Sequence, residues 1–84
     1  MNQFLIQHTF VFKPRNYFVV AGIILNGRVA KGMVYSPTVN KNLKIISVEI
    51  ITYELSHSAI ALLFANEETD LSFLFKVGET ILLY

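Results

Sequence analysis

Apolar and polar residues alternate with a period of two along much of this chain, which is the pattern of half-buried β-strands. The first such segment covers residues 4–12 and ends before a polar stretch. We expect its apolar face to lie in the core, with one histidine satisfied there by a hydrogen bond. That face carries Phe4, Ile6, His8, Phe10 and Phe12.

Turn-forming residues divide the rest of the chain into further short strands. Pro14 and Asn16 predict a turn at residues 13–16, because proline fixes φ and asparagine tolerates unusual backbone angles. Residues 71–77 fit either a strand or a helical turn. The other expected strands are residues 17–25, 33–36, 43–54, 59–65 and 80–83, and the other expected turns and loops are residues 37–42, 56–58, 66–70 and 78–79.

Four glycines are expected to be structural, because glycine allows turns and close backbone packing. Asn26-Gly27 is a strong short-range indication of a hairpin. We expect a type I′ turn there, which pairs residues 17–25 with a returning strand at 28–31. The structural turn glycines are Gly22, Gly27, Gly32 and Gly78.

The short, regular spacing of strands and turns favours an all-β barrel or sandwich. Residues 17–25 are apolar on both faces, as expected of a strand in a barrel wall that is packed on two sides. We therefore predict one all-β domain over residues 1–84, a small closed Greek-key-type β-barrel of about six to seven strands.

Four short motifs follow one another along most of the chain. They are Val19-Val20-Ala21-Gly22 with Gly27 and Gly32, then Val48-Glu49, then Ile60-Ala61-Leu62-Leu63-Phe64, and finally Gly78-Glu79-Thr80-Ile81-Leu82. In spacing and order these motifs resemble the second domain of elongation factor Tu and its relatives, the β-barrel of translational GTPases. The resemblance implies that barrel fold and a role in translation.

The same resemblance implies a contact with RNA. In elongation factor Tu, a Glu in the long strand and an Arg just after the apolar strand lie near the aminoacyl end of the tRNA. Glu49 matches the Glu, whereas Ala65 stands in place of the Arg. Met33 replaces the acidic residue usual after the third glycine, and His57-Ser58 replaces the usual Gly-Asp pair.

Composition adds a second line of argument about partners. Apolar residues make up 54% of the chain and charged residues 15%, which is rich in apolar residues for a free-standing soluble domain. We expect a protein partner or a second copy to cover part of this surface. The net charge of +1 argues against a broad electrostatic surface for nucleic acid, because phosphate contacts need clustered Lys and Arg.

Basic residues are concentrated in the first half of the chain, and hairpin tips that bring them together would form a modest basic rim. A carboxylate within an apolar strand must face solvent or find a donor, which makes Glu49 a further candidate. The candidate binding residues are Lys13, Arg15, Arg28, Lys31 and Glu49.

Two functional hypotheses follow. The first is a non-catalytic binding module that docks on RNA or a ribonucleoprotein, based on the resemblance and the charge asymmetry. The alternative is a protein–protein interaction or self-association module without nucleic-acid binding, based on the apolar fraction and the weak net charge. In the second case the partner is another protein or a homo-oligomer.

Other functions are not expected. The chain has no Gly-x-x-x-x-Gly-Lys-Ser/Thr motif, so we expect no nucleotide. It has no cysteine, and its two histidines and scattered carboxylates lack metal-ligand spacing, so we expect no metal and no cofactor. Ser56 and Ser58 flank His57 without an acid to orient its ring, so we expect no enzyme. No apolar run is long enough for a membrane-spanning helix and no signal peptide is evident, so we expect a cytoplasmic location.

Overall fold

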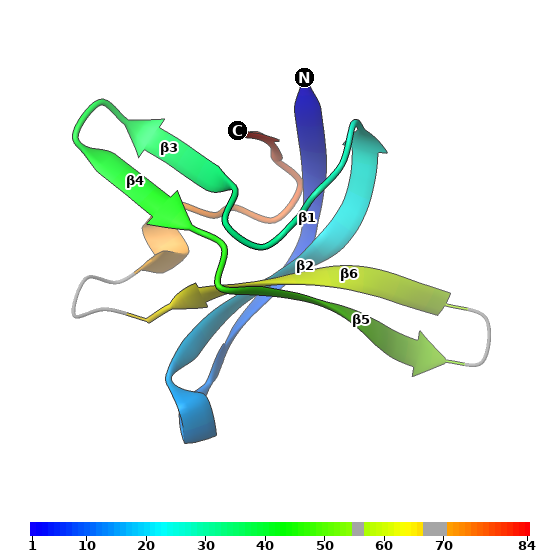
Figure 1. The fold of residues 1–84 in the computed structure, drawn as a ribbon. Helices are drawn as coiled ribbons and strands as arrows, with labels where there is room; N and C mark the ends of the chain where they lie inside the picture. Colours follow the sequence, from blue (N-terminus) through cyan, green and yellow to red (C-terminus); the bar gives the residue numbers. More distant parts are fainter. Residues whose placement is uncertain (55–56, 67–70) are drawn as a thin grey trace.

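The computed structural model describes residues 1–54, 57–66 and 71–84 and shows an all-β protein (Figure 1). Two short 3-10 turns, η1 (Lys13–Arg15) and η2 (Leu71–Phe73), accompany the strands. The strands are β1 (Asn2–Phe12), β2 (Tyr17–Asn26), β3 (Val34–Thr38), β4 (Lys41–Lys44), β5 (Ser47–Glu54), β6 (His57–Ala65) and β7 (Thr80–Leu83).

The strands form a five-stranded sheet in the order β5-β6-β2-β1-β7 and a two-stranded sheet of β3 and β4. The predicted all-β class is thus confirmed. In the described part of the chain, β5 and β7 lie at opposite edges of the larger sheet and do not pair, so strand pairing shows no closed barrel. Two backbone hydrogen bonds between Val34 and Tyr84, of 2.8 and 3.0 Å, connect β3 to the end of β7.

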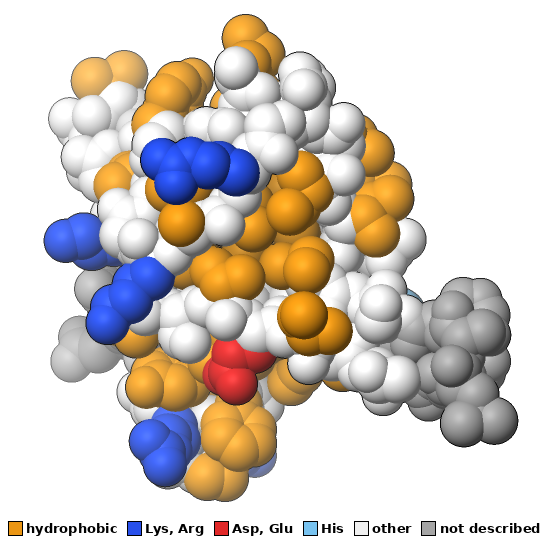
Figure 2. All heavy atoms as spheres, turned by 45° about the vertical axis from the view of Figure 1, so that its right-hand side comes forward, with side chains coloured by type: hydrophobic (Ala, Val, Ile, Leu, Met, Phe, Trp, Pro, Cys, Tyr) orange, Lys and Arg blue, Asp and Glu red, His pale blue; other side chains and the backbone are white. Residues whose placement is uncertain are grey.

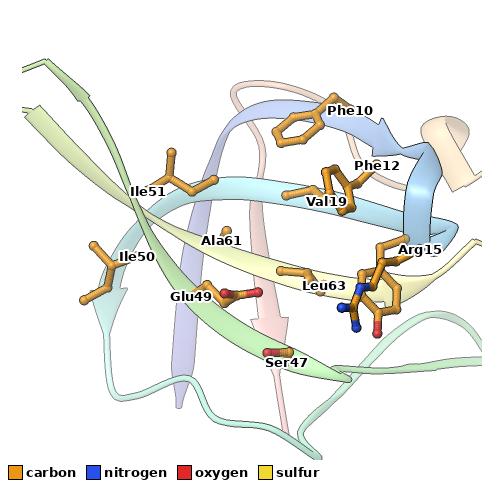
Figure 3. Close-up of a pocket in the computed structure, with 11 residues that line it drawn as sticks. Phe10, Phe12, Arg15, Val19, Ser47, Glu49, Ile50, Ile51, Ala61 and Leu63 are labelled. Atoms are coloured by element: carbon orange, nitrogen blue, oxygen red, sulfur yellow. The ribbon is translucent and has the colours of Figure 1, made fainter.

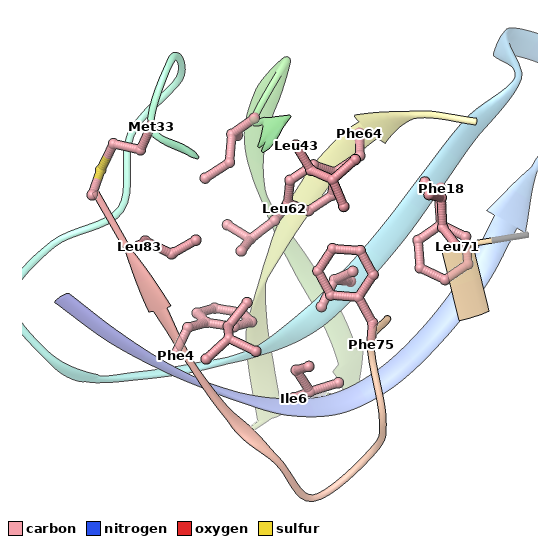
Figure 4. Packing of buried hydrophobic residues seen from close by; sticks show 13 residues of the cluster. Phe4, Ile6, Phe18, Met33, Leu43, Leu62, Phe64, Leu71, Phe75 and Leu83 are labelled. Atoms are coloured by element: carbon pink, nitrogen blue, oxygen red, sulfur yellow. The ribbon is translucent and has the colours of Figure 1, made fainter. Parts of the chain in front are cut away.

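The core lies between one face of the larger sheet and the β3–β4 ribbon (Figure 4). The segment around η2 closes it, with Leu71 completely buried. Phe75 packs against three aromatic rings, with centroid distances of 5.5 Å to Phe18 and 5.0 Å to both Tyr35 and Phe64. Aromatic contacts of this kind stabilise a fold beyond the area they bury.

The register between β1 and β2 shifts in the middle of β1. Ile6 pairs with Gly22, whereas His8 pairs with the next residue, Ala21. Gln7 is therefore an extra residue in β1, and the pair forms a β-bulge. Because side chains alternate along a strand, one extra residue turns all later side chains to the other face of the sheet.

The bulge separates two sets of apolar residues in β1. Phe4 and Ile6 are completely buried in the core, whereas Phe10 is 43% and Phe12 is 45% exposed. The prediction that all four side chains share one buried face is therefore wrong. His8, predicted in the core, is exposed for the same reason.

Gly22 lies inside β2 at this bulge and not in a turn. A Cβ atom at this position would collide with the carbonyl oxygen of Leu5 and would lie 3.1 Å from the Phe4 ring. Glycine is thus what lets the backbone of β1 approach β2 where the register shifts.

The predicted hairpin at Asn26-Gly27 is wrong. A type I′ turn needs positive φ at both central residues, but among the described non-glycine residues only Asn16 has a positive φ, whereas Gly27 has a φ of 72°. The backbone N–H of Arg28 donates to Oδ1 of Asn2 over 3.0 Å, which directs the chain toward the start of β1. Residues 28–30 form no strand, and β3 pairs with β4 instead.

The predicted long strand at 43–54 is two strands that belong to different sheets. The chain turns a corner between them. The N–H of Ile45 donates to the carbonyl of Met33 near β3, and the N–H of Ile46 donates to the carbonyl of Leu63 in β6, both over 2.8 Å. The alternation of apolar residues does not reveal this corner, because Ile45 lies in it and is itself buried on the core side.

The remaining predicted strands and turns differ from the structure mainly at their boundaries. The strands expected at 17–25, 59–65 and 80–83 are confirmed as β2, β6 and β7. Strands β3 and β4 take up all of the predicted loop 37–42 except residues 39–40, and residues 57–58 begin β6 instead of forming a turn. Residues 71–73 are helical, and residue 56 and residues 67–70 lie outside the described part of the chain.

We expect Gly22→Ala to lower the free energy of unfolding by about 3 kcal/mol, because the new Cβ atom meets rigid backbone. Gly78→Ala is a matched control, since Gly78 has a φ of 94° but open space around it. It should cost about 1 kcal/mol of backbone strain alone. Urea unfolding followed by circular dichroism measures both. Equal losses would contradict the close approach at the bulge.

Tyr35 links the ribbon to the core, because its hydroxyl donates to the carbonyl oxygen of Leu74 over 3.1 Å. Burial, and to a smaller extent the Glu79 carboxylate, raises the pKa of Tyr35 above its usual 10.0. As the pH rises, the unfolded chain therefore loses the proton of the Tyr35 hydroxyl at a lower pH than the folded protein does. The contribution to stability is complete below about pH 10 and is lost as the pH rises through the folded-state pKa. Urea unfolding at increasing alkaline pH should show a smaller decline in Tyr35→Phe than in wild type.

Candidate functional site

The face of the five-stranded sheet opposite the core contains a half-open groove of about 670 Å³ (Figure 3). Val19 lies between the core residues Phe18 and Val20 along β2, so its side chain points to this opposite face. With Ala61 and Leu63 of β6 it forms a buried apolar floor. The groove is thus part of the sheet itself and does not depend on loops.

Two aromatic side chains form the wall on the β1 side. Phe10 pairs with Val19 and Phe12 pairs with Tyr17, and all four line the groove. Cross-strand pairs of this kind hold aromatic rings against the neighbouring strand. Because the two phenylalanines are roughly half exposed, they offer a partly preformed apolar contact surface.

The opposite wall comes from β5. Ser47, Glu49 and Ile51 pair with small or apolar residues of β6, which places them on the groove face. Glu49 stands opposite Ala61, whose short side chain leaves the carboxylate open to solvent. Among the described residues, the carboxylate of Glu49 has no hydrogen-bond or ion-pair partner.

Arg15 lies at one end of the groove, on η1. The next residue, Asn16, adopts the left-handed conformation with φ of 53°, which asparagine tolerates better than most residues. Its side-chain Nδ2 donates to the carbonyl of Asn66 over 2.9 Å, and its own carbonyl accepts from the Asn66 N–H over 3.0 Å. These bonds fix the turn that presents Arg15 beside the start of β2.

Two of the five predicted binding residues share the groove. Figure 3 shows the head groups of Glu49 and Arg15 on either side of Leu63. Arg15 forms no ion pair within the described residues. Lys13 lies on the same 3-10 turn but does not line the groove. The groove therefore combines an apolar floor with one separate cation and one separate anion.

The other two predicted residues lie elsewhere. Arg28 is next to Asn2 at the start of β1, whereas Lys13 follows the end of this strand of 11 residues. At about 3.3 Å per residue, the two sites are roughly 35 Å apart along the strand. Lys31 is close to Gly32, which bonds to Ile45. Figure 2 shows Lys and Arg side chains at several separate places, so no single basic rim forms on this face.

Phe10 and Phe12 are groove residues that the sequence does not single out, because period-two alternation assigns them to the core. The register shift that exposes them leaves no direct trace in their own spacing. Gly22 is the sequence feature that permits the shift, but a glycine in an apolar strand has several explanations.

Within the described residues, no group of three or more His, Asp or Glu side chains lies close enough to hold a metal ion. In that same part of the chain, no helix has the length and apolar character needed to cross a membrane. Comparison with protein-family models, with curated proteins and with solved structures found no match to this chain.

A tryptophan placed in the groove would report on its geometry, because the chain has no natural tryptophan. We expect Phe12→Trp to emit at shorter wavelength than Phe73→Trp, since Phe12 is 45% exposed against the apolar wall and Phe73 is 77% exposed. Identical emission maxima and identical quenching by iodide in two folded variants would contradict a groove at this position.

Proposed function

We propose that this chain is a non-catalytic protein-interaction module that binds an extended segment of a partner polypeptide in the groove. The supporting observation is the combination of a buried apolar floor with two half-exposed phenylalanines, flanked by Arg15 and Glu49. The volume of about 670 Å³ is in the range of ordinary binding pockets.

The charges of the groove define the chemistry of this segment. Complementary charges across an interface give specificity and fix the register of the ligand. A basic side chain of the segment would meet Glu49, and an acidic side chain would meet Arg15. Apolar side chains between them would cover Leu63 and Val19, which form the floor.

Charge also favours a polypeptide over RNA in this groove. A nucleic-acid site needs several cations along the phosphate backbone. The groove has one cation, Arg15, and its carboxylate at Glu49 would repel phosphates. Arg28 lies at the other end of β1 and adds nothing to it.

For the fold, we propose a barrel like the second domain of elongation factor Tu. Two features support it. The hydrogen bonds between Val34 and Tyr84 connect β3 to one edge of the larger sheet, and the corner at residues 45–46 leads from β4 into the other edge strand. The β3–β4 ribbon thus spans from one edge to the other.

Selection from a library of displayed random peptides tests the proposed ligand class. We expect enriched peptides to combine bulky apolar residues with at least one Lys or Arg. Phe12→Ser should weaken their binding about tenfold or more, since it removes roughly 1.5–3 kcal/mol of apolar contact. Phe73→Ser is the matched control, because Phe73 is exposed outside the groove.

Reversing the charge at Glu49 tests the proposed ligand more specifically than removing the Phe12 ring does. Glu49→Lys should change the selected peptides from basic to acidic at the matching position while the protein stays folded. If no peptides are enriched, or if Phe12→Ser binds the selected peptides as wild type does, the groove is not a polypeptide site.

A second candidate is RNA docking at η1, where Lys13 and Arg15 lie together beside the exposed ring of Phe12. In that case a Lys13→Glu and Arg15→Glu double variant should lose binding to single-stranded RNA, and wild-type binding should weaken steeply with salt. The pair Arg28→Glu and Lys31→Glu is the control with the same change of charge. Equal RNA binding by both double variants would eliminate this candidate.

A further inference from the structure

The two edges of the five-stranded sheet differ. Strand β7 forms one edge, and the hydrogen bonds between Val34 and Tyr84 connect its end to β3. Strand β5 forms the other edge, and within the described residues it pairs with β6 alone. In Figure 1 the β5–β6 hairpin extends away from the β3–β4 ribbon, which leaves the outer side of β5 uncovered.

An uncovered edge strand presents a row of free backbone donors and acceptors, and proteins usually protect it with lysine, proline or a bulge. From Ser47 to Thr52 the strand has neither lysine nor proline, and its register with β6 is continuous. Its residues are rich in β-branched side chains, which favour strand pairing. Ile50 is 73% exposed.

We propose that β5 pairs antiparallel with β5 of a second copy of this chain, which makes a two-fold symmetric dimer. An antiparallel pair of identical strands is self-complementary, so one surface supplies both sides of the interface. Because each copy uses the same edge, β5, the pairing leaves no second β5 edge free and closes at two chains.

The charge on β5 is compatible with this pairing. In any register centred at Ile50 or Ile51, Glu49 stands opposite an uncharged residue of the second copy. A register centred at Glu49 would set this residue opposite its own copy, and one centred between Ile51 and Thr52 would set Glu49 opposite Glu54; like charges opposite each other are unfavourable across strands. The carboxylate thus selects registers in which isoleucines meet near the two-fold axis.

The two-fold axis is perpendicular to the sheet in such a pair, because the two central strands run in opposite directions with the same face upward. The two grooves then lie on the same face of one continuous sheet, and neither is covered. This dimer goes beyond the proposed peptide binding and does not depend on it.

The expected affinity is modest. One short pair of strands buries less than the roughly 1,200–2,000 Å² of a standard stable interface. We therefore expect dissociation at low micromolar concentrations and a dimer at several hundred micromolar. Sedimentation velocity should show a mass that rises with concentration from 9.6 kDa toward twice this value.

Two variants test the edge directly. Ile50→Lys and Thr52→Lys should each raise the dimer dissociation constant about tenfold or more, because lysine on an edge strand opposes pairing. Val39→Lys makes the same apolar-to-lysine change at a residue that is 97% exposed outside the sheet, and it should dimerise as wild type does. Circular dichroism verifies that each variant is folded.

Hydrogen exchange locates the interface. Backbone amides of β5 should exchange more slowly at high than at low protein concentration, while those at residues 39–40 should not change. A monomer at all concentrations, or a dimer that keeps its affinity in both β5 variants, would overturn the proposal. Phe12→Ser should still dimerise, so failure of the groove and failure of the edge give different results.

Discussion

The close approach of β1 to β2 at Gly22 is the constraint on which the two faces of the sheet depend. A side chain at this position would collide with the Leu5 carbonyl, so the bulge at Gln7 requires glycine on the opposite strand. Before the bulge, β1 contributes Phe4 to the core, and after it β1 contributes Phe10 to the groove. One inserted residue thus divides the apolar residues of a single strand between the core and the groove.

The size of the chain explains why an apolar face stays open. A domain of this size buries only about 60% of the surface that its unfolded chain exposes. The β3–β4 ribbon and the segment around η2 cover one face of the larger sheet. No described element covers the other face, where Val19, Ala61 and Leu63 are buried only by their neighbours within the sheet. Part of the apolar content of the chain, which is 54% of its residues, therefore stays exposed at the groove and along β5.

Rules based on neighbouring residues predicted the positions of the strands better than they predicted which strands pair. Turn residues such as Asn16 and Gly78 marked real changes of direction, because positive φ is a property of single residues. The path of the chain after β2 instead includes a contact between residues far apart in the sequence, Arg28 with Asn2. The groove was predictable only in part. Arg15 was a candidate as a basic residue at a turn and Glu49 as a carboxylate within an apolar strand, but the bulge that exposes Phe12 is set by tertiary contact between two strands.

The groove and the free edge of β5 use different parts of the same strand. Side chains such as Glu49 stand perpendicular to the sheet, whereas backbone donors and acceptors lie in its plane. A ligand in the groove therefore leaves the edge free, and pairing at the edge leaves the groove open. In a two-fold dimer the two Glu49 carboxylates lie near the centre of one face, between the two apolar floors. A partner with two basic apolar segments would bind both grooves at once, and the link between its segments would raise the effective concentration of the second. Weak association at β5 then gains strength from the ligand, because the dimer is the form that holds both segments.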